Sequence, residues 1–93
     1  MAELRRRREQ ILAIAKRRGA TEVRVFGSVA DGSAVESSDV DLLVSLERGR
    51  SLVDLAGLRL DLEDYLGCSV DVVTEAGLRT RVRGEVMRTA RPL

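Results

Sequence analysis

The chain has 93 residues, of which 44% are hydrophobic and 33% are charged, and its formal net charge is +1. This apolar content excludes a chain disordered by composition, and the near balance of charge lacks the basic excess usual in nucleic-acid-binding domains. Because the sequence holds one cysteine and no histidine, it also excludes an internal disulfide, a cysteine-based zinc site and a histidine general base.

In chain order, hydrophobic periodicity and turn residues predict a helix, a strand, a polar connection, a strand, a helix, a strand and a final helix. These segments are residues 2–18, 22–26, 29–38, 39–46, 52–66, 68–73 and 76–90. Gly19 and Gly67 are expected to end the first two helices, and Ser51 is expected to cap the start of the second.

The second predicted helix has leucines at helical spacing, and all of them are expected in the core: Leu52, Leu55, Leu58, Leu62 and Leu66. The alternation of strands and helices predicts one small α/β domain over residues 1–93, with a three-stranded mixed sheet flanked by helices. The start of the chain is charged and no apolar run reaches membrane-spanning length, so a cytoplasmic protein with no membrane partner is expected.

Two aspartates lie two positions apart in the second predicted strand. Asp39 and Asp41 share one strand face, about 7 Å apart at their bases. Like charges on one face repel each other unless a cation neutralises them. Asp71 lies in an apolar run of the third strand and completes a three-carboxylate cluster if the two strands are neighbours. Such a cluster favours Mg²⁺ and suits two-metal phosphoryl transfer.

Gly27 and Ser28 follow the first predicted strand, ten residues before Asp39. A glycine at a strand end lets the backbone approach a ligand closely, and the following N–H groups and the Ser28 hydroxyl can donate to phosphate oxygens. Taken singly, each feature has an ordinary structural explanation as a turn or a solvated strand face. Their combination, in this order and on these elements, favours a nucleotide and metal site.

The spacing of these residues carries a family resemblance. Gly27-Ser28, ten residues, and then Asp39-Val40-Asp41-Leu42-Leu43-Val44 resemble the motif of the DNA polymerase beta-like nucleotidyltransferase superfamily. Within it, the whole chain resembles the minimal nucleotidyltransferases, which pair with HEPN-domain partners. The resemblance implies the nucleotidyltransferase fold.

The resemblance also implies a role for each site residue. Asp39, Asp41 and Asp71 would be catalytic and would hold two Mg²⁺ ions, while Gly27 and Ser28 would bind the triphosphate of ATP. Many family members are antitoxins that inactivate a HEPN ribonuclease, in some cases by transferring AMP to a tyrosine on it. The implied activity is therefore transfer of a nucleoside monophosphate to a hydroxyl of a partner protein.

One position departs from the family pattern. Many relatives carry a basic residue near Asp31, and here the residue is acidic. An acid close to a triphosphate is unfavourable unless it points away or meets a cation. This departure concerns the affinity for the nucleotide and not the metal site.

Two other functions are left open by the sequence. The chain could neutralise its partner by occlusion without catalysis, as a binding antitoxin. It could also act on nucleic acid as a direct partner, but its near-neutral charge and its two aromatic residues, Phe26 and Tyr65, count against this. Homo-oligomerisation, the nucleotide preference and the modified residue are not decided by the sequence.

Overall fold

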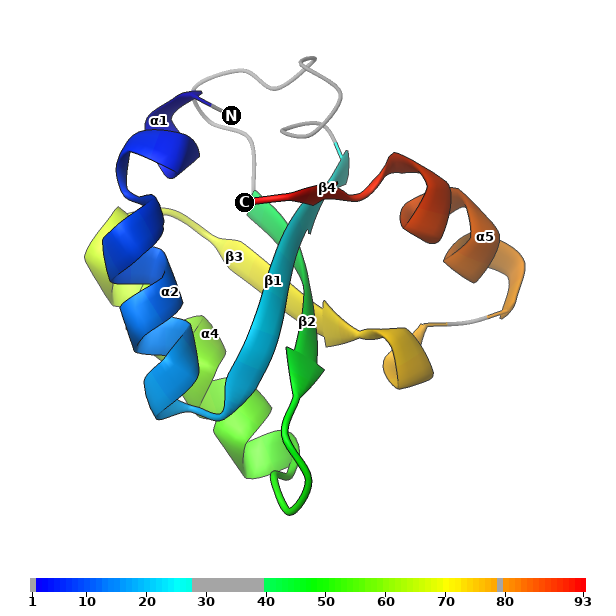
Figure 1. Ribbon diagram of the computed structural model, residues 1–93, viewed down its shortest axis with the longest axis horizontal. Helices are drawn as coiled ribbons and strands as arrows, with labels where there is room; N and C mark the ends of the chain where they lie inside the picture. The colour runs from blue at the N-terminus through cyan, green and yellow to red at the C-terminus, as the bar shows by residue number, and fades with distance from the viewer. Residues whose placement is uncertain (1, 28–39, 79) are drawn as a thin grey trace.

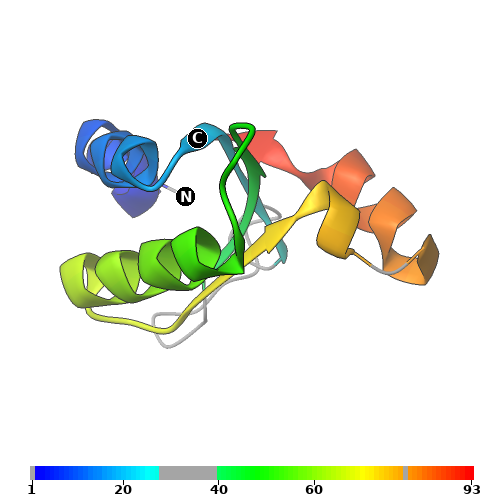
Figure 2. The same cartoon turned by 90° about the horizontal axis from the view of Figure 1, so that it is seen from below.

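The computed structural model describes residues 2–27, 40–78 and 80–93. Its elements are the helices α1 (Ala2–Arg6), α2 (Arg8–Arg17), α4 (Leu52–Leu66) and α5 (Thr80–Thr89), the 3₁₀ turn η1 (Glu75–Gly77), and the strands β1 (Ala20–Phe26), β2 (Val40–Leu46), β3 (Val70–Thr74) and β4 (Arg91–Pro92). The helices α2 and α4 lie on one side of the sheet and α5 lies on the other (Figures 1 and 2). The predicted α/β class is confirmed.

The four described strands form a mixed sheet in the order β3-β2-β1-β4. Strand β2 pairs antiparallel with β1 and parallel with β3, and β4 pairs antiparallel with β1. The parallel pair is connected through α4, as a parallel connection requires a crossover. The Asp39–Leu46 prediction therefore matches β2 from Val40 onward, while Asp39 and the connection 29–38 lie outside the described residues.

The core lies between the sheet and the helices α2 and α4. Alternate residues of the strands point into it, so that Val25, Leu42 and Val70 are at most 1% exposed. Val44 of β2 is also fully buried, and the two helices contribute Ile11, Ala15, Leu58 and Leu62. Each buried leucine or isoleucine contributes roughly 1.5–3 kcal/mol through removal of apolar surface from water.

Helix α4 begins and ends where the sequence predicts. The Ser51 Oγ accepts from the Val53 N–H at 3.2 Å, and the Ser51 N–H donates to the Asp54 carboxylate at 3.0 Å, which forms a capping box. Gly67 adopts φ 71°, the left-handed conformation that favours glycine after a helix. The Ser51 and Gly67 predictions are confirmed.

The prediction that all five leucines of α4 are core is wrong at Leu52, which is 80% exposed. Leu58 and Leu62 are fully buried, and Leu55 and Leu66 pack against the core as half-buried side chains. The reason is geometric: at about 100° per residue, six residues leave Leu52 roughly 120° around the helix axis from Leu58. Each leucine lies at helical spacing from the next one, but over nearly two turns the position of Leu52 has rotated away from the buried face of the helix.

The predicted count of three strands is also wrong, because β4 adds a fourth. Its two residues pair with Arg24 and Val25 of β1, and the Leu93 N–H donates to the Val23 carbonyl at 3.3 Å. Pro92 is the second of these two residues. It fits an edge strand, where a missing N–H costs no ladder hydrogen bond. Leu93, 8% exposed, anchors this end of the chain in the core.

Two predicted helices are interrupted. The segment 2–18 breaks at Arg7, whose backbone has φ −100° and ψ 12° and divides α1 from α2. The segment 76–90 begins later than predicted, because the Thr74 Oγ1 caps a short 3₁₀ turn and Leu78 is extended, so that α5 starts at Thr80. The hydrophobic periodicity of the sequence reveals neither interruption.

We predict that Leu58→Ala lowers the free energy of unfolding by about 2–5 kcal/mol, because it removes a fully buried side chain and leaves a cavity. Leu52→Ala, in the same helix, is the matched control and is expected to change it by less than about 0.5 kcal/mol. Urea unfolding at low micromolar chain concentration measures both. Equal losses from the two variants would contradict the assignment of the buried face.

Candidate functional site

Two of the three predicted aspartates lie side by side. Asp41 of β2 and Asp71 of β3 are register partners in the parallel pair, so their backbones are about 4.8 Å apart. Their flanking residues Val40, Leu42 and Val70 are buried against the helices. Since side chains alternate along a strand, both carboxylates belong to the opposite face, where Asp41 is half-buried and Asp71 is exposed. The structure thus meets the condition that the two strands are neighbours.

Gly27 lies directly against this pair. Its predecessor Phe26 is the register partner of Asp41 on the antiparallel side, and Gly27 itself has φ 73°. A Cβ atom at this position would collide with the Oδ2 atom of Asp41. The backbone conformation therefore favours glycine here, and any larger residue would also displace the Asp41 carboxylate.

The remaining predicted site residues, Asp39 and Ser28, lie outside the described residues, as does Asp31. Within residues 2–27, 40–78 and 80–93, no group of three acidic, histidine or cysteine side chains is arranged to hold a metal ion. The described carboxylates Asp41 and Asp71 are hard oxygen donors, the kind that Mg²⁺ prefers. They fit a divalent cation in chemistry, with two of the three predicted ligands on the described strands.

A basic residue on the same face was missed by the sequence analysis. Arg24 lies two residues before Phe26 in β1, so it shares the face of Asp41. Its guanidinium donates to the Glu22 carboxylate, and this hydrogen bond and charge, with a smaller contribution from Glu75, raise the pKa of Arg24. The alternation of Glu22, Arg24 and Phe26 with Val23 and Val25 was the signal available in the sequence.

The arginines of the last helix do not act as a group in the described structure. Arg83 pairs with Glu75 and ties α5 to the 3₁₀ turn that follows β3. Arg88 and Arg91 are exposed. Arg79 and the side chain of Arg81 lie outside what the structure describes.

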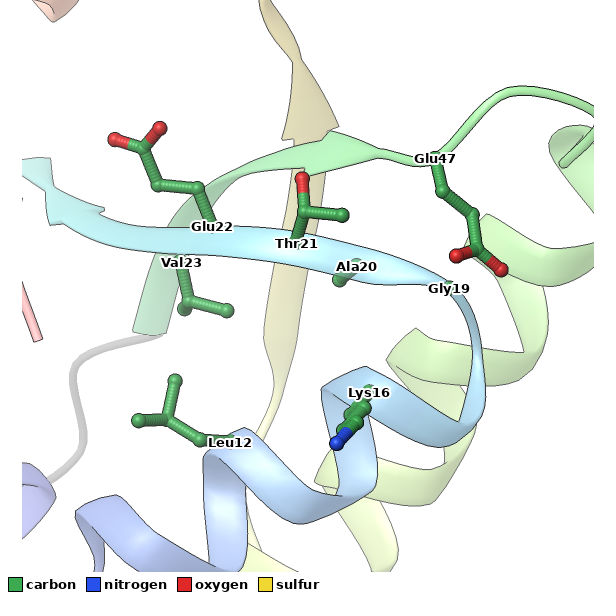
Figure 3. A pocket seen from close by; sticks show the side chains of 8 residues that line it. All are labelled: Leu12, Lys16, Gly19, Ala20, Thr21, Glu22, Val23 and Glu47. Carbon is green, nitrogen blue, oxygen red and sulfur yellow. The ribbon is translucent and has the colours of Figure 1, made fainter.

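A surface hollow of about 400 Å³ lies at the opposite end of β1 from Gly27 (Figure 3). Leu12 and Lys16 of α2 form one wall, and the first residues of β1 form the other. None of the residues lining it is a predicted site residue. The carboxylate pair, and not this hollow, is therefore the candidate site.

Comparison with known proteins finds relatives of this chain in sequence and in structure. A nucleotidyltransferase domain family model matches residues 8–92. The protein adenylyltransferase MntA of Thermococcus cleftensis is 41% identical over 73 residues, which are 78% of this chain and 74% of that protein. MJ0435 of Methanocaldococcus jannaschii, described as a candidate protein adenylyltransferase, is 34% identical over 83 residues, 89% of either chain.

Solved structures share the fold. A candidate minimal nucleotidyltransferase superposes with a TM-score of 0.86 at 55% identity, covering 99% of this chain and 94% of that one. A toxin-antitoxin structure with AMP-PNP superposes with a TM-score of 0.77 over 90% of this chain and 69% of that one. At 20% identity, the second likeness shows the fold alone. Among the described helices, none has the length and apolar character needed to cross a membrane.

We predict that Gly27→Ala and Gly67→Ala each lower the stability by about 1–2 kcal/mol, because both glycines have φ near 70°. Only Gly27→Ala is expected to displace the Asp41 carboxylate, since nothing lies within 4 Å of a Cβ at Gly67. The ¹³C shift of the Asp41 carboxyl, followed by NMR in both variants, measures this. An Asp41 signal that moves equally in both, or in neither, would contradict the close approach.

Proposed function

This chain belongs to the minimal nucleotidyltransferase family, and we propose that it transfers AMP from ATP to a hydroxyl group of a partner protein. The observation that carries the proposal is the register pairing of Asp41 with Asp71 beside Gly27. Paired carboxylates on an open sheet face are suited to metal-assisted phosphoryl chemistry. The named protein adenylyltransferase relatives support AMP as the transferred group.

In this proposal, Asp39, Asp41 and Asp71 hold two Mg²⁺ ions. Bound Mg²⁺ would neutralise the triphosphate and the developing charge on the leaving pyrophosphate, and would lower the pKa of the attacking hydroxyl. The protein's own contribution is to fix the carboxylates: β2 and β3 are held in register, and the core behind them prevents either strand from sliding. Asp71, the more exposed of the described pair, is the one nearer to an incoming acceptor hydroxyl.

Gly27 and Ser28 are proposed to bind the triphosphate. Gly27 directly follows β1 and has a left-handed backbone conformation beside the carboxylate pair. The N–H groups that follow, together with the Ser28 hydroxyl, would donate to phosphate oxygens. Arg24 would add a positive charge on the same face, which offsets the acidic Asp31 where many relatives carry a base.

The acceptor is proposed to be a HEPN-domain toxin, for which this chain is the antitoxin. Two findings support a protein acceptor. The sequence relatives include a protein adenylyltransferase, and solved structures of the same fold include toxin-antitoxin proteins. Asp71 is exposed, and side-chain alternation along β3 assigns it to the sheet face away from α2 and α4, so a macromolecule can reach it. Neutralisation by occlusion alone is the competing role, and the experiment below separates the two.

We predict that Asp39→Asn, Asp41→Asn and Asp71→Asn each reduce AMP transfer at least about 100-fold, because each removes charge that the reaction needs. Intact-mass spectrometry of the co-expressed partner, incubated with ATP and Mg²⁺, measures the transfer. Glu9→Gln, an exposed acid on α2, is the matched control and should keep full activity. Chelation of Mg²⁺ should abolish the mass gain of the partner, and adding Mg²⁺ back should restore that gain.

The catalytic proposal would be contradicted if the partner gained no mass from the wild-type chain and yet formed a stable complex with the wild type and with all three variants. That outcome would instead establish an antitoxin that acts by occlusion.

We predict that Arg24→Ala raises the KM for ATP several-fold with a smaller change in kcat, because the proposed contact is made to the bound triphosphate. Arg88→Ala is the control, since this exposed arginine lies on α5 and has no assigned role in the site. Initial rates of AMP transfer at varied ATP concentration give both constants. An unchanged KM in Arg24→Ala would show that Arg24 serves only its ion pair with Glu22.

A further inference from the structure

Helix α4 exposes an apolar stripe on the side away from the core. The stripe consists of Leu52, Val53, Ala56 and Leu60, and its three large members are 80%, 77% and 63% exposed. At about 100° per residue, these four positions fall within roughly a 100° sector of the helix. Apolar side chains gathered on one helix face, rather than scattered singly, mark an interaction surface.

The two ends of this stripe carry opposite charge. Arg48 lies in the turn before α4, and Asp64 lies one turn beyond Leu60. Both side chains are exposed, and neither is in an ion pair within the part of the chain that the structure describes. By contrast, two neighbouring charged residues are already paired within the chain. Arg50 pairs with Glu47 and Asp54, and Glu63 pairs with Arg59.

We propose that this stripe binds the same stripe of a second copy of the chain, with the two α4 helices antiparallel about a two-fold axis at Ala56. Ala56 is the small central residue, and it allows close approach of the helices. In this arrangement, Leu60 packs against Leu52 of the partner subunit. The same axis brings Asp64 toward the end of the partner helix that follows the turn holding Arg48 of the partner subunit, so that the two charges can pair, and the reverse pair forms by symmetry.

Charge complementarity favours a second copy as the occupant. A stripe that is basic at one end and acidic at the other matches itself only when it is reversed, which is the arrangement that a two-fold axis produces. Antiparallel helices also place opposite dipole ends side by side. The net charge of +1 for each chain adds little repulsion between copies.

The proposed dimer leaves the carboxylate pair accessible. Helix α4 covers the core face of the sheet (Figure 2). Side-chain alternation assigns Asp41 and Asp71 to the other face. The stripe covers only about two helical turns, so the contact falls in the size class of weak interfaces. A dimer is therefore expected to form at tens of micromolar chain concentration or above, and it is independent of AMP transfer.

Site-specific cross-linking tests the two-fold axis. In a Cys68→Ala background, Ala56→Cys places one thiol at the proposed axis, and Val82→Cys places one on the 42% exposed Val82 of α5 as a control. A short bis-maleimide should convert most of the Ala56→Cys chain to a covalent dimer and little of the Val82→Cys chain. Equal cross-linking of the two variants would overturn the proposal.

Sedimentation equilibrium tests the charge pairing. Leu60→Glu should raise the dimer dissociation constant at least tenfold, while circular dichroism stays unchanged. Asp64→Arg and Arg48→Asp should each weaken the dimer several-fold, and the double variant should recover most of the loss. The dimer would be overturned if the chain stayed monomeric at high concentration. If Leu60→Glu then weakened binding of the co-expressed partner, the stripe would be the binding surface for that partner.

Discussion

The parallel register of β2 with β3 is the constraint on which the site depends. It places Asp41 beside Asp71 although thirty positions separate them in the chain, and it holds only while α4 crosses between the two strands. The crossover is stabilised by Leu58 and Leu62, which are fully buried beneath the sheet, and by the capping box at Ser51. Two like charges are therefore held together by apolar packing on the opposite face of the same strands. The divalent cation of the proposed function would bind these two carboxylates together.

The antiparallel strand on the other side of β2 completes the arrangement. Strand β1 brings Phe26 opposite Asp41, and Gly27 then allows the backbone to lie where any side chain would strike that carboxylate. Strand β1 is itself fixed at both edges, by β2 and by β4, whose following residue Leu93 is buried in the core. The proposed phosphate-binding turn thus begins from an anchored strand.

Much of the fold is predictable from the sequence because the hydrophobic pattern of its helices and strands is periodic. The alternation in β2 identifies the face of Asp41, and serine and glycine identify the ends of α4. The adjacency of Asp41 and Asp71 could only be stated conditionally, since strand pairing is a non-local property. Strand β4 has too few residues to show a period, and the break at Arg7 leaves no compositional mark. The prediction for Leu52 failed because its spacing to Leu55 is helical, whereas its position on the helix lies outside the buried face. Arg24 was overlooked because its importance comes from a neighbouring strand.

The central claim is that Asp41 and Asp71, held in register beside Gly27, form a divalent cation site. The most direct test is a titration of the ¹⁵N-labelled chain with Mn²⁺, which broadens the NMR signals of nuclei close to it. Selective loss of the amide signals of Gly27, Asp41 and Asp71 at the lowest Mn²⁺ concentrations is the predicted result. Uniform broadening, or earlier loss at the acidic residues Glu47 and Asp54 beyond the other end of β2, would contradict it.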